Sequence, residues 1–307
     1  MNVRTVAYVM CLPPGLHPGM DTVAHGIAAG LGSTADLRIL PADLRDPHFT
    51  MAQLNAVSAA TDANVDGIIL FVLDEKEPAP AVWRAIGKNI PVIAFHKPAY
   101  EVTASVVVPN FSHGIYLTQF LARHLDDHPR VAIIGGPPIL DDDEFVEGLV
   151  AGSHRCLFDL VNDPHDPACR NQADVKGGGL AAIDHVLDTC PDLDALIVFN
   201  DETLLDALPA LDSRGLLGRL PVVCRNGSPA AVEAVRRGDL LATYDYGLPE
   251  IGLAAGQLLA DLFTNGTDHE DTIVCPTPGR VLHEDNVDSY VPWDQRAASI
   301  PLTVGFE

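Results

Sequence analysis

Short continuous runs of apolar residues alternate along this chain with longer segments in which apolar residues recur three and four positions apart. The short runs are typical of strands buried on both faces of a parallel sheet, and the longer spacing is typical of helices with one apolar face. In the first part of the chain the pattern predicts strands over 6–10, 37–40, 67–73, 91–95 and 105–108, and helices over 20–31, 50–62 and 79–88.

The second part of the chain repeats this plan. Its predicted strands are 131–134, 156–161, 195–199 and 221–224, and its predicted helices are 113–125, 143–151, 179–188, 203–211 and 229–236. Parallel strands are joined by right-handed crossovers, so the pattern predicts an α/β protein of two doubly wound parallel-sheet lobes. Ligands of such sheets bind beyond the carboxyl ends of the strands, where this chain places polar residues.

The length of the chain agrees with two lobes, and its charge argues against nucleic acid and anionic membranes as partners. The 307 residues suit about two domains of ~150 residues. Nineteen Lys and Arg against 42 Asp and Glu give a net charge of −23, a field that repels nucleic acid and anionic membrane surfaces. The apolar run at the N-terminus is too short to span a bilayer and no cleavage site follows it, so the sequence predicts neither membrane insertion nor export.

Common catalytic and metal-binding motifs are missing from the sequence, so no cofactor and no metal site is predicted. His124 and His128 stand near a helix end, where the helix dipole explains them better than a metal does. The acidic run 141–144 precedes a helix and is expected to cap it rather than hold a cation. The glycines of 176–179 fit either an anion-binding loop or a left-handed turn. Six dispersed cysteines favour free thiols over disulfides.

Six segments, taken in their order and spacing, resemble the type I periplasmic sugar-binding proteins, the ribose-binding-protein family that also supplies the effector domain of LacI-type repressors. They are VDGIIL at 65–70, NIPVIAF at 89–95, DALIVFND at 194–201, LPVV at 220–223, GDLLAT at 238–243 and EDNVD at 284–288. The resemblance implies two lobes joined by a three-segment hinge that close on one small ligand. It places 1–109 and 247–275 in the N-terminal lobe, and 110–246 and 276–307 in the C-terminal lobe.

The resemblance also implies ligand-contacting positions, and several of them carry unusual residues here. The usual aromatic residue after the first strand is replaced around His17 and Met20. The usual Asp-Arg pair is replaced by His96 and Lys97, and an Arg before Gly148 by Phe145. The complete expected set is His17, Met20, Asp74, His96, Lys97, Phe145, Asn200, Arg225, Asn226 and Tyr246.

The changes at these positions bear on the charge of the ligand. Carboxylates are lost while His96 and Arg225 are gained. Lys97 and Arg225 are then cations beside the expected ligand, and a buried cation needs a partner. One interpretation is an acidic ligand such as a sugar acid, with Phe145 and Tyr246 as the stacking face. The alternative is that both cations point outward and pair with acids of the chain itself.

Five of the expected contacts have structural explanations that stay open. Asn200 is also placed to cap a helix, and Asn226 before Gly227 suits a turn. His17 lies in a Pro- and Gly-rich loop that favours a solvated side chain. Phe145 fits the core-facing side of a helix and Asp74 an exposed loop.

A protein that binds a ligand and performs no chemistry fits these features best. The leading hypothesis is a solute-binding protein of a carbohydrate ABC-type uptake system, with a small sugar or sugar acid as ligand and a membrane permease as partner. It would be extracytoplasmic if a signal peptide has been removed, and cytoplasmic if Met1 is the native start. One alternative is a stand-alone cytosolic sugar sensor or a LacI-type effector domain without a DNA-binding domain, because no basic helix-turn-helix precedes Val6. The other is an enzyme, such as a lyase or isomerase, acting on a carbohydrate acid.

Overall fold

The computed structural model describes residues 3–266 and 272–306, and the chain divides into two compact units. Unit 1 consists of Met1–Val108, Gly247–Thr277 and Trp293–Glu307, and unit 2 of Pro109–Tyr246 and Pro278–Pro292. The expected assignment of 276–307 to the second lobe is wrong for its last part. The short strand β13 (Thr303–Val304) pairs with β2 (Ala35–Pro41) in the sheet of unit 1. The two residues of β13 are too short a run to show as a strand in the sequence.

Unit 1 is built on a parallel sheet with the strand order β11-β5-β4-β3-β1-β2-β13. Its remaining strands are β1 (Arg4–Met10), β3 (Gly67–Phe71), β4 (Val92–Phe95), β5 (Ala104–Val106) and β11 (Thr272–Val274). β3 and β4 are buried along their whole length, which explains why they read as unbroken apolar runs. The parallel α/β architecture expected from the sequence is confirmed.

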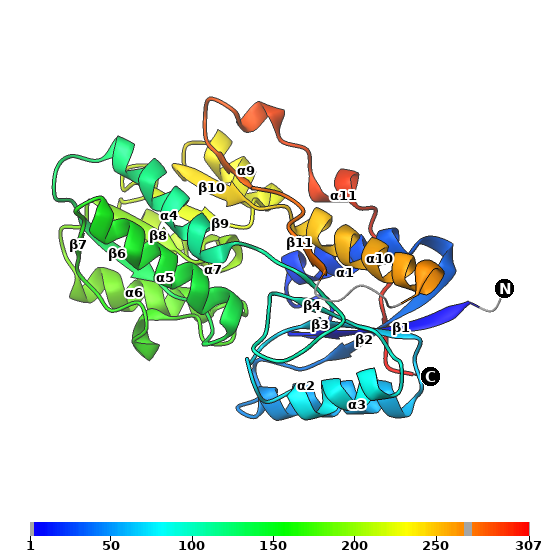
Figure 1. Ribbon diagram of the computed structural model, residues 1–307. Helices are drawn as coiled ribbons and strands as arrows, with labels where there is room; N and C mark the ends of the chain where they lie inside the picture. The colour runs from blue at the N-terminus through cyan, green and yellow to red at the C-terminus, as the bar shows by residue number, and fades with distance from the viewer. Residues whose placement is uncertain (1–2, 267–271, 307) are drawn as a thin grey trace. The chain divides into compact units, whose positions relative to one another are not determined.

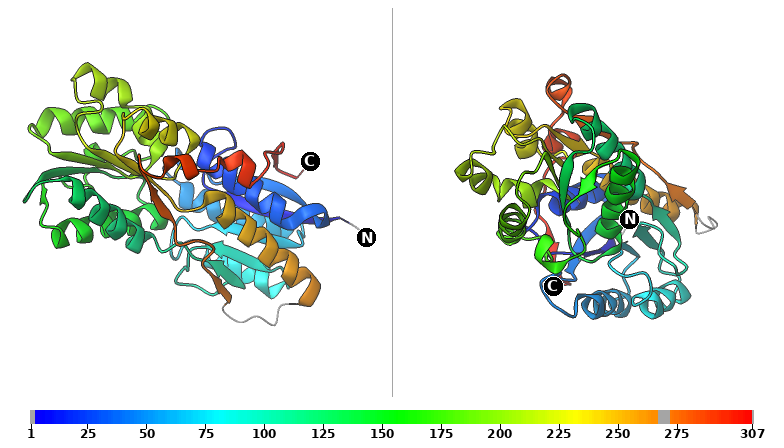
Figure 2. Two further views of the ribbon diagram at one scale, coloured as in Figure 1. Left: turned by 90° about the horizontal axis from the view of Figure 1, so that it is seen from above. Right: turned by 90° about the vertical axis from the view of Figure 1, so that its left-hand side faces the viewer.

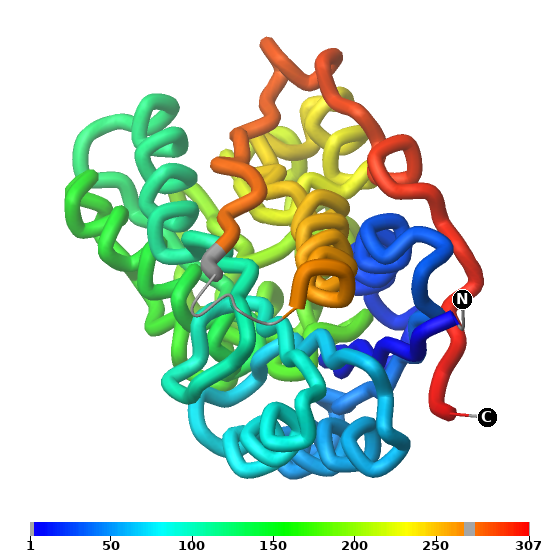
Figure 3. The backbone as a smooth tube through the Cα atoms, turned by 45° about the vertical axis from the view of Figure 1, so that its right-hand side comes forward, coloured from blue at the N-terminus to red at the C-terminus, as the bar shows by residue number. Residues whose placement is uncertain are grey.

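Helices cover both faces of this sheet. Figure 1 shows α2 (Phe49–Asp62) and α3 (Ala79–Gly87) on one face and α1 (Pro18–Leu31) and α10 (Leu248–Asn265) on the other. α1 and α10 lie side by side (Figure 3), and glycines allow their close approach. A Cβ added to Gly26 would lie 2.4 Å from the Pro249 carbonyl oxygen.

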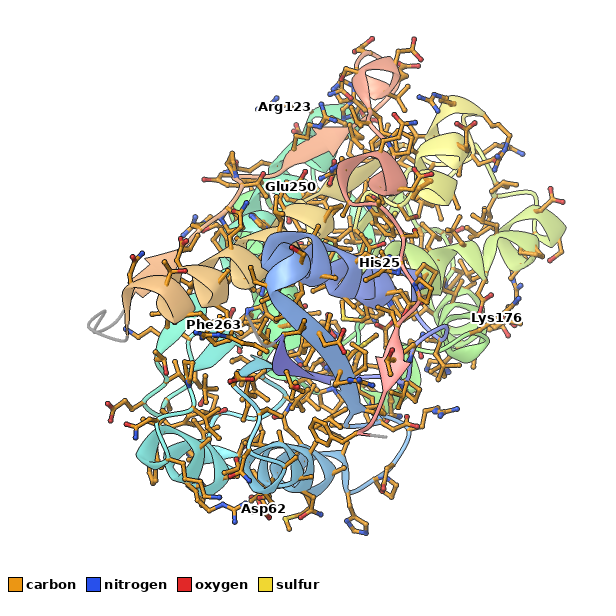
Figure 4. The ribbon with its side chains drawn as sticks, turned by 90° about the vertical axis from the view of Figure 1, so that its right-hand side faces the viewer. His25, Asp62, Arg123, Lys176, Glu250 and Phe263 are labelled. Atoms are coloured by element: carbon orange, nitrogen blue, oxygen red, sulfur yellow. The ribbon has the colours of Figure 1, made fainter. Side chains whose placement is uncertain are left out.

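Besides the pairing of β13, side-chain contacts attach the C-terminal segment to unit 1. Arg296 of the short helix α11 (Trp293–Arg296) donates through Nε to Glu250 of α10 at 2.8 Å. His25 of α1 has its Nε2 within 3.1 Å of the Ile300 carbonyl oxygen, in the segment that runs past it in Figure 4. These long-range bonds explain why 293–307 belongs with unit 1.

Unit 2 is built on a sheet with the order β12-β10-β9-β8-β6-β7, in which β12 is antiparallel to β10 and the other pairs are parallel. The strands are β6 (Arg130–Ile134), β7 (Asp159–Leu160), β8 (Ala195–Val198), β9 (Val222–Arg225), β10 (Ala242–Asp245) and β12 (Arg280–Leu282). α4 (Asn110–Leu121) and α5 (Leu140–Arg155) lie on one face, opposite α6 (Gly178–Thr189) (Figure 2). α7 (Asp201–Leu205), α8 (Leu208–Ser213) and α9 (Pro229–Arg236) pack with α6 into one apolar core.

The sequence prediction is wrong for two elements of unit 2. The strand expected over 156–161 is reduced to Asp159–Leu160, because Leu157 has a left-handed backbone with φ 60°. The helix expected over 203–211 is split into α7 and α8. Pro209 lies in the first turn of α8, and it has no N–H with which to continue α7.

All six cysteines are free thiols, and Cys11, Cys169 and Cys224 are buried. Within residues 3–266 and 272–306, no helix has both the length and the apolar character needed to cross a membrane.

Candidate functional site: an arginine between two aspartates at the edge of unit 2

The carboxyl ends of the strands in unit 2 bring together side chains from α4, α5, β9 and β10. Arg225, the last residue of β9, lies among them and is only 2% exposed. Its Nη2 donates to Asp142 Oδ1 at 2.9 Å and to Asp141 Oδ2 at 3.1 Å. A buried arginine needs such partners, because an unpaired charge in the interior is costly.

Asn110 closes the arrangement into a ring of hydrogen bonds. Its Oδ1 accepts from Arg225 Nη1 at 3.1 Å, while its Nδ2 donates to Asp141 Oδ1 at 2.7 Å. Asn110 is the first residue of α4, directly after the point where the chain leaves unit 1. The ring therefore ties the first turns of α4 and α5 to the end of β9.

The expected helix-capping role of the acidic run 141–144 is wrong for Asp141 and Asp142. The residue at the N-cap of α5 is Ile139, which makes no side-chain capping bond. Asp141 and Asp142 lie in the first turn, where the helix dipole favours negative charge, and they accept hydrogen bonds from Arg225 instead. Burial and the neighbouring Asp141 raise the pKa of Asp142, against the opposing effect of Arg225.

Two aromatic rings flank the guanidinium. The Arg225 Cζ lies 4.2 Å from the centre of the Phe145 ring and 5.1 Å from that of Tyr246, within the range of cation–π attraction. Phe145 follows Asp141 by four residues and so shares its face of α5. The structure therefore places Phe145, Arg225 and Tyr246 in one cluster, although sequence reasoning had kept a core position open for Phe145.

Asn200 and Asn226 lie at the same edge of the sheet and each pairs with an acid. Asn200 caps α7, because its Oδ1 accepts from the Thr203 backbone N–H at 2.9 Å, and its Nδ2 donates to Asp174 at 2.7 Å. Asn226 has a left-handed backbone with φ 129°, and its Nδ2 donates to Glu202 at 2.6 Å. The capping role expected for Asn200 is confirmed, while contact with a ligand stays a prediction.

Asp201 beside them is fully buried and joins strand ends together. It accepts from the Ser228 backbone N–H at 2.7 Å and from Thr243 Oγ1 at 2.6 Å. Burial, followed by the charge of Glu202, raises the pKa of Asp201 to about 7. This carboxyl group is structural and is not presented to a ligand.

The expected contacts of unit 1 lie after β1, β3 and β4. His17 is 2% exposed and caps α1 by accepting from the Met20 backbone N–H at 3.2 Å, so the solvated side chain expected for it is wrong. His96 is buried against Phe71 and has a left-handed φ of 68°. Lys97 is exposed, whereas Met20 is buried.

Asp74 is half-buried and uses its carboxylate within its own loop. Its Oδ1 accepts from the backbone N–H groups of Lys76 at 2.8 Å and Glu77 at 2.7 Å. Asp74 therefore orders the turn after β3, and contact with a ligand stays a prediction.

The minor motifs found in the sequence are explained by local structure. Gly177 has a left-handed φ of 88°, and its N–H bonds to Asp206, which supports the turn alternative for 176–179. His124 Nδ1 lies 3.0 Å from the Phe120 carbonyl oxygen, and His128 lies outside the helix with φ 54°. Among residues 3–266 and 272–306 no group of three or more His, Cys, Asp or Glu is arranged to hold a metal ion.

Sequence reasoning missed several residues of this edge. Asn110, Asp141, Asp142, His113, Asp174 and Glu202 were not among the expected ligand contacts. Asn110 comes two residues after the last predicted strand of the first lobe, and this position could have identified it. The pairing of Arg225 with Asp142 spans 83 residues, and no local pattern indicates it.

Comparisons with known proteins agree with this architecture. Residues 46–267 match the family described as the periplasmic binding protein domain. The D-ribose/D-allose-binding protein of Pseudomonas aeruginosa is 25% identical over 250 residues, covering 76% of this chain and 75% of that protein. The xylitol-binding protein of Mycolicibacterium smegmatis is 25% identical over 248 residues, covering 77% of this chain and 66% of that protein.

A solved structure shows the same fold over almost the whole chain. An ABC transporter solute-binding protein from Bacillus halodurans C-125, solved with bound myo-inositol, superposes with a TM-score of 0.78 at 19% identity, covering 94% of this chain and 96% of that one. These relatives are solute-binding proteins and not enzymes. The chain thus belongs to the periplasmic binding protein domain family, as a type I periplasmic sugar-binding protein.

Proposed function

We propose that this protein binds a small neutral sugar or polyol at the carboxyl edge of unit 2 and delivers it to an ABC-type importer outside the cytoplasm. The observation that carries the proposal is the internal neutralisation of Arg225. Two carboxylates and one amide oxygen already occupy its Nη groups. The guanidinium therefore has no need of a ligand carboxylate.

The acidic-ligand interpretation loses its basis for the same reason. It rested on Lys97 and Arg225 as cations beside the ligand that need a partner. Lys97 is exposed, and the chain itself supplies the partners of Arg225. Asp141, Asp142 and Arg225 together carry one excess negative charge when both acids are ionised, and none when Asp142 holds a proton. A ligand carboxylate would meet no attraction from such a cluster, and repulsion if both aspartates are charged.

Hydroxyl groups suit the remaining chemistry of this edge. Carboxylates and amide oxygens accept hydrogen bonds from hydroxyls, and aromatic rings cover the C–H faces of sugars. Asp174 and Glu202 add carboxylates, and Phe145 and Tyr246 add rings. The names of the relatives, which are binding proteins for ribose, allose and xylitol, support the same class of ligand.

A thermal-shift screen tests the proposal, because a ligand that binds only the folded state raises the melting temperature. The screen compares neutral ligands, among them ribose, allose, xylitol and myo-inositol, with sugar acids of matching carbon skeleton. At least one neutral ligand is expected to raise the melting temperature by several degrees. A shift with the acids alone contradicts the proposal, and so does the absence of a shift across the panel.

A further inference from the structure

His113, in the first turn of α4, is a buried histidine whose ring nitrogens are both unpaired. Its side chain is 1% exposed, and neither Nδ1 nor Nε2 has a hydrogen-bond partner among the described residues. A neutral imidazole has one donor and one acceptor, and each destabilises the folded protein when it is buried without a partner. A phenylalanine or leucine would fill the same space without this cost.

The surroundings of His113 connect it with the binding edge. It follows Asn110 by three residues, so both side chains lie on the same face of α4, and Asn110 is a member of the Arg225 ring. The His113 ring lies 4.8 Å from the Tyr244 ring and 6.0 Å from the Tyr246 ring, measured between centres. Tyr246 in turn faces Arg225.

A second polar atom of this cluster is also unpaired. Arg225 Nε has no hydrogen-bond partner among residues 3–266 and 272–306, although both Nη groups are engaged. Burial, together with the charge of Arg225, lowers the pKa of His113 to about 4, so the ring is neutral at pH 7 and keeps one donor and one acceptor. The cluster thus holds unused donors and an unused acceptor beside two aromatic rings.

We infer that His113 is a specificity-determining residue, and that one of its ring nitrogens hydrogen-bonds a hydroxyl group of the bound sugar or polyol. The inference rests on the proposed function and adds a contact that the expected set of site residues lacks. In the bound state a hydroxyl group of the ligand pairs with a His113 ring nitrogen that has no hydrogen-bond partner among the described residues. The same contact would disfavour ligands with a hydrogen atom in place of that hydroxyl.

The test compares His113→Phe with His113→Gln by isothermal titration calorimetry, using the neutral ligand that gives the largest thermal shift with the wild type. His113→Phe keeps a ring of similar size and removes both polar atoms. It is expected to raise the melting temperature of the free protein and to weaken binding about tenfold or more. His113→Gln restores a donor and an acceptor and is expected to recover part of the lost affinity.

Ser153→Ala is the matched control, because Ser153 is fully buried on α5 and its Oγ also has no described partner. Its affinity is expected to equal that of the wild type. A folded His113→Phe variant with wild-type affinity overturns this inference and leaves the proposed function standing. If the wild-type protein binds no neutral ligand, the proposed function fails and the inference fails with it. If His113→Phe does not fold, NMR of the wild-type protein decides the question, and an imidazole signal of His113 that does not change on addition of the ligand overturns the inference.

Discussion

Arg225 donates to Asp142 at 2.9 Å, and the two side chains are 2% and 6% exposed. Their elements, β9 and α5, are joined by the same guanidinium that also bonds Asn110 of α4. Removing one partner of a buried ion pair is more damaging than losing the pair as a whole, because the other charge remains buried alone.

Arg225→Met is therefore expected to lower the free energy of unfolding by about 3–5 kcal/mol, since Asp141 and Asp142 keep their burial and lose their cation. Urea denaturation at pH 7 measures the loss. The control is Arg237→Met, which removes an exposed arginine paired with Asp239 and should cost less than ~1 kcal/mol. An equal loss of unfolding free energy in the two variants would mean that the buried Arg225 ion pair stabilises the protein no more than the exposed Arg237 pair does.

The stability of the protein is expected to fall as the pH rises from about 5 to 8. Burial raises the pKa of Asp201 to about 7, above the ~3.9 of an unfolded aspartate. The folded state thus holds a proton that the unfolded state has released. Its contribution is fully present below the unfolded pKa and is lost as the pH rises through about 7.

Asp201→Asn tests this dependence, since an amide oxygen can still accept from the Ser228 backbone N–H while no proton titrates. Urea denaturation at pH 5 and pH 8 should give a smaller difference for Asp201→Asn than for the wild type. Asp212→Asn, an exposed change on α8, should keep the wild-type difference. The same pH dependence in all three proteins would assign it to other groups.

Close packing of α4 against α5 is expected to be essential for the position of Asp141 and Asp142. A Cβ added to Gly148 would lie 2.1 Å from the Phe111 carbonyl oxygen, so the two helices would have to move apart. Gly148→Ala is expected to cost about 2–3 kcal/mol in urea denaturation and to weaken ligand binding as well. In Gly87→Ala the new Cβ meets nothing within 4 Å, and this control should be neutral or stabilising. If Gly148→Ala leaves the free energy of unfolding unchanged, α4 and α5 are not in close contact in solution.

Substitution of Asn200 can distinguish its role in capping α7 from a role in ligand binding. Asn200→Ala removes the cap of α7 and is expected to cost about 1 kcal/mol of stability. Ser228→Ala removes the equivalent cap of α9, which Ser228 Oγ makes with Ala231 N–H at 3.2 Å, at a similar cost. Calorimetric titration should show weaker binding for Asn200→Ala alone. Unchanged affinity in both variants would limit Asn200 to capping.

The sequence predicts the central strands well, because strands such as β3 and β8 are buried on both faces and consist of continuous apolar residues. β10 was not predicted, because Ala242–Asp245 mixes polar residues into a buried strand. Thr243 and Asp245 find their polar partners across the sheet, in Asp201 and Arg280. Polar positions of that kind are satisfied by tertiary contacts, which local periodicity does not show.

The charge of the candidate site also depends on tertiary contacts that the sequence pattern does not show. Sequence and resemblance together identified Arg225, Phe145 and Tyr246, which the structure brings into one cluster. The acids of α5 were taken for caps, because an Asp at the start of a helix usually serves the helix itself. Their actual partner lies on another strand, so the charge of the site could be known only from the fold.

A calorimetric titration with matched ligand pairs tests the central claim most directly. The wild-type protein is titrated with a neutral sugar or polyol and with the acid of the same carbon skeleton, such as ribose with ribonate and xylitol with xylonate. An internally neutralised Arg225 predicts that the neutral member of at least one pair binds at least about tenfold more tightly than its acid. Tighter binding of the acids would contradict the account, because it would mean that the Arg225 cluster presents a positive charge to the ligand.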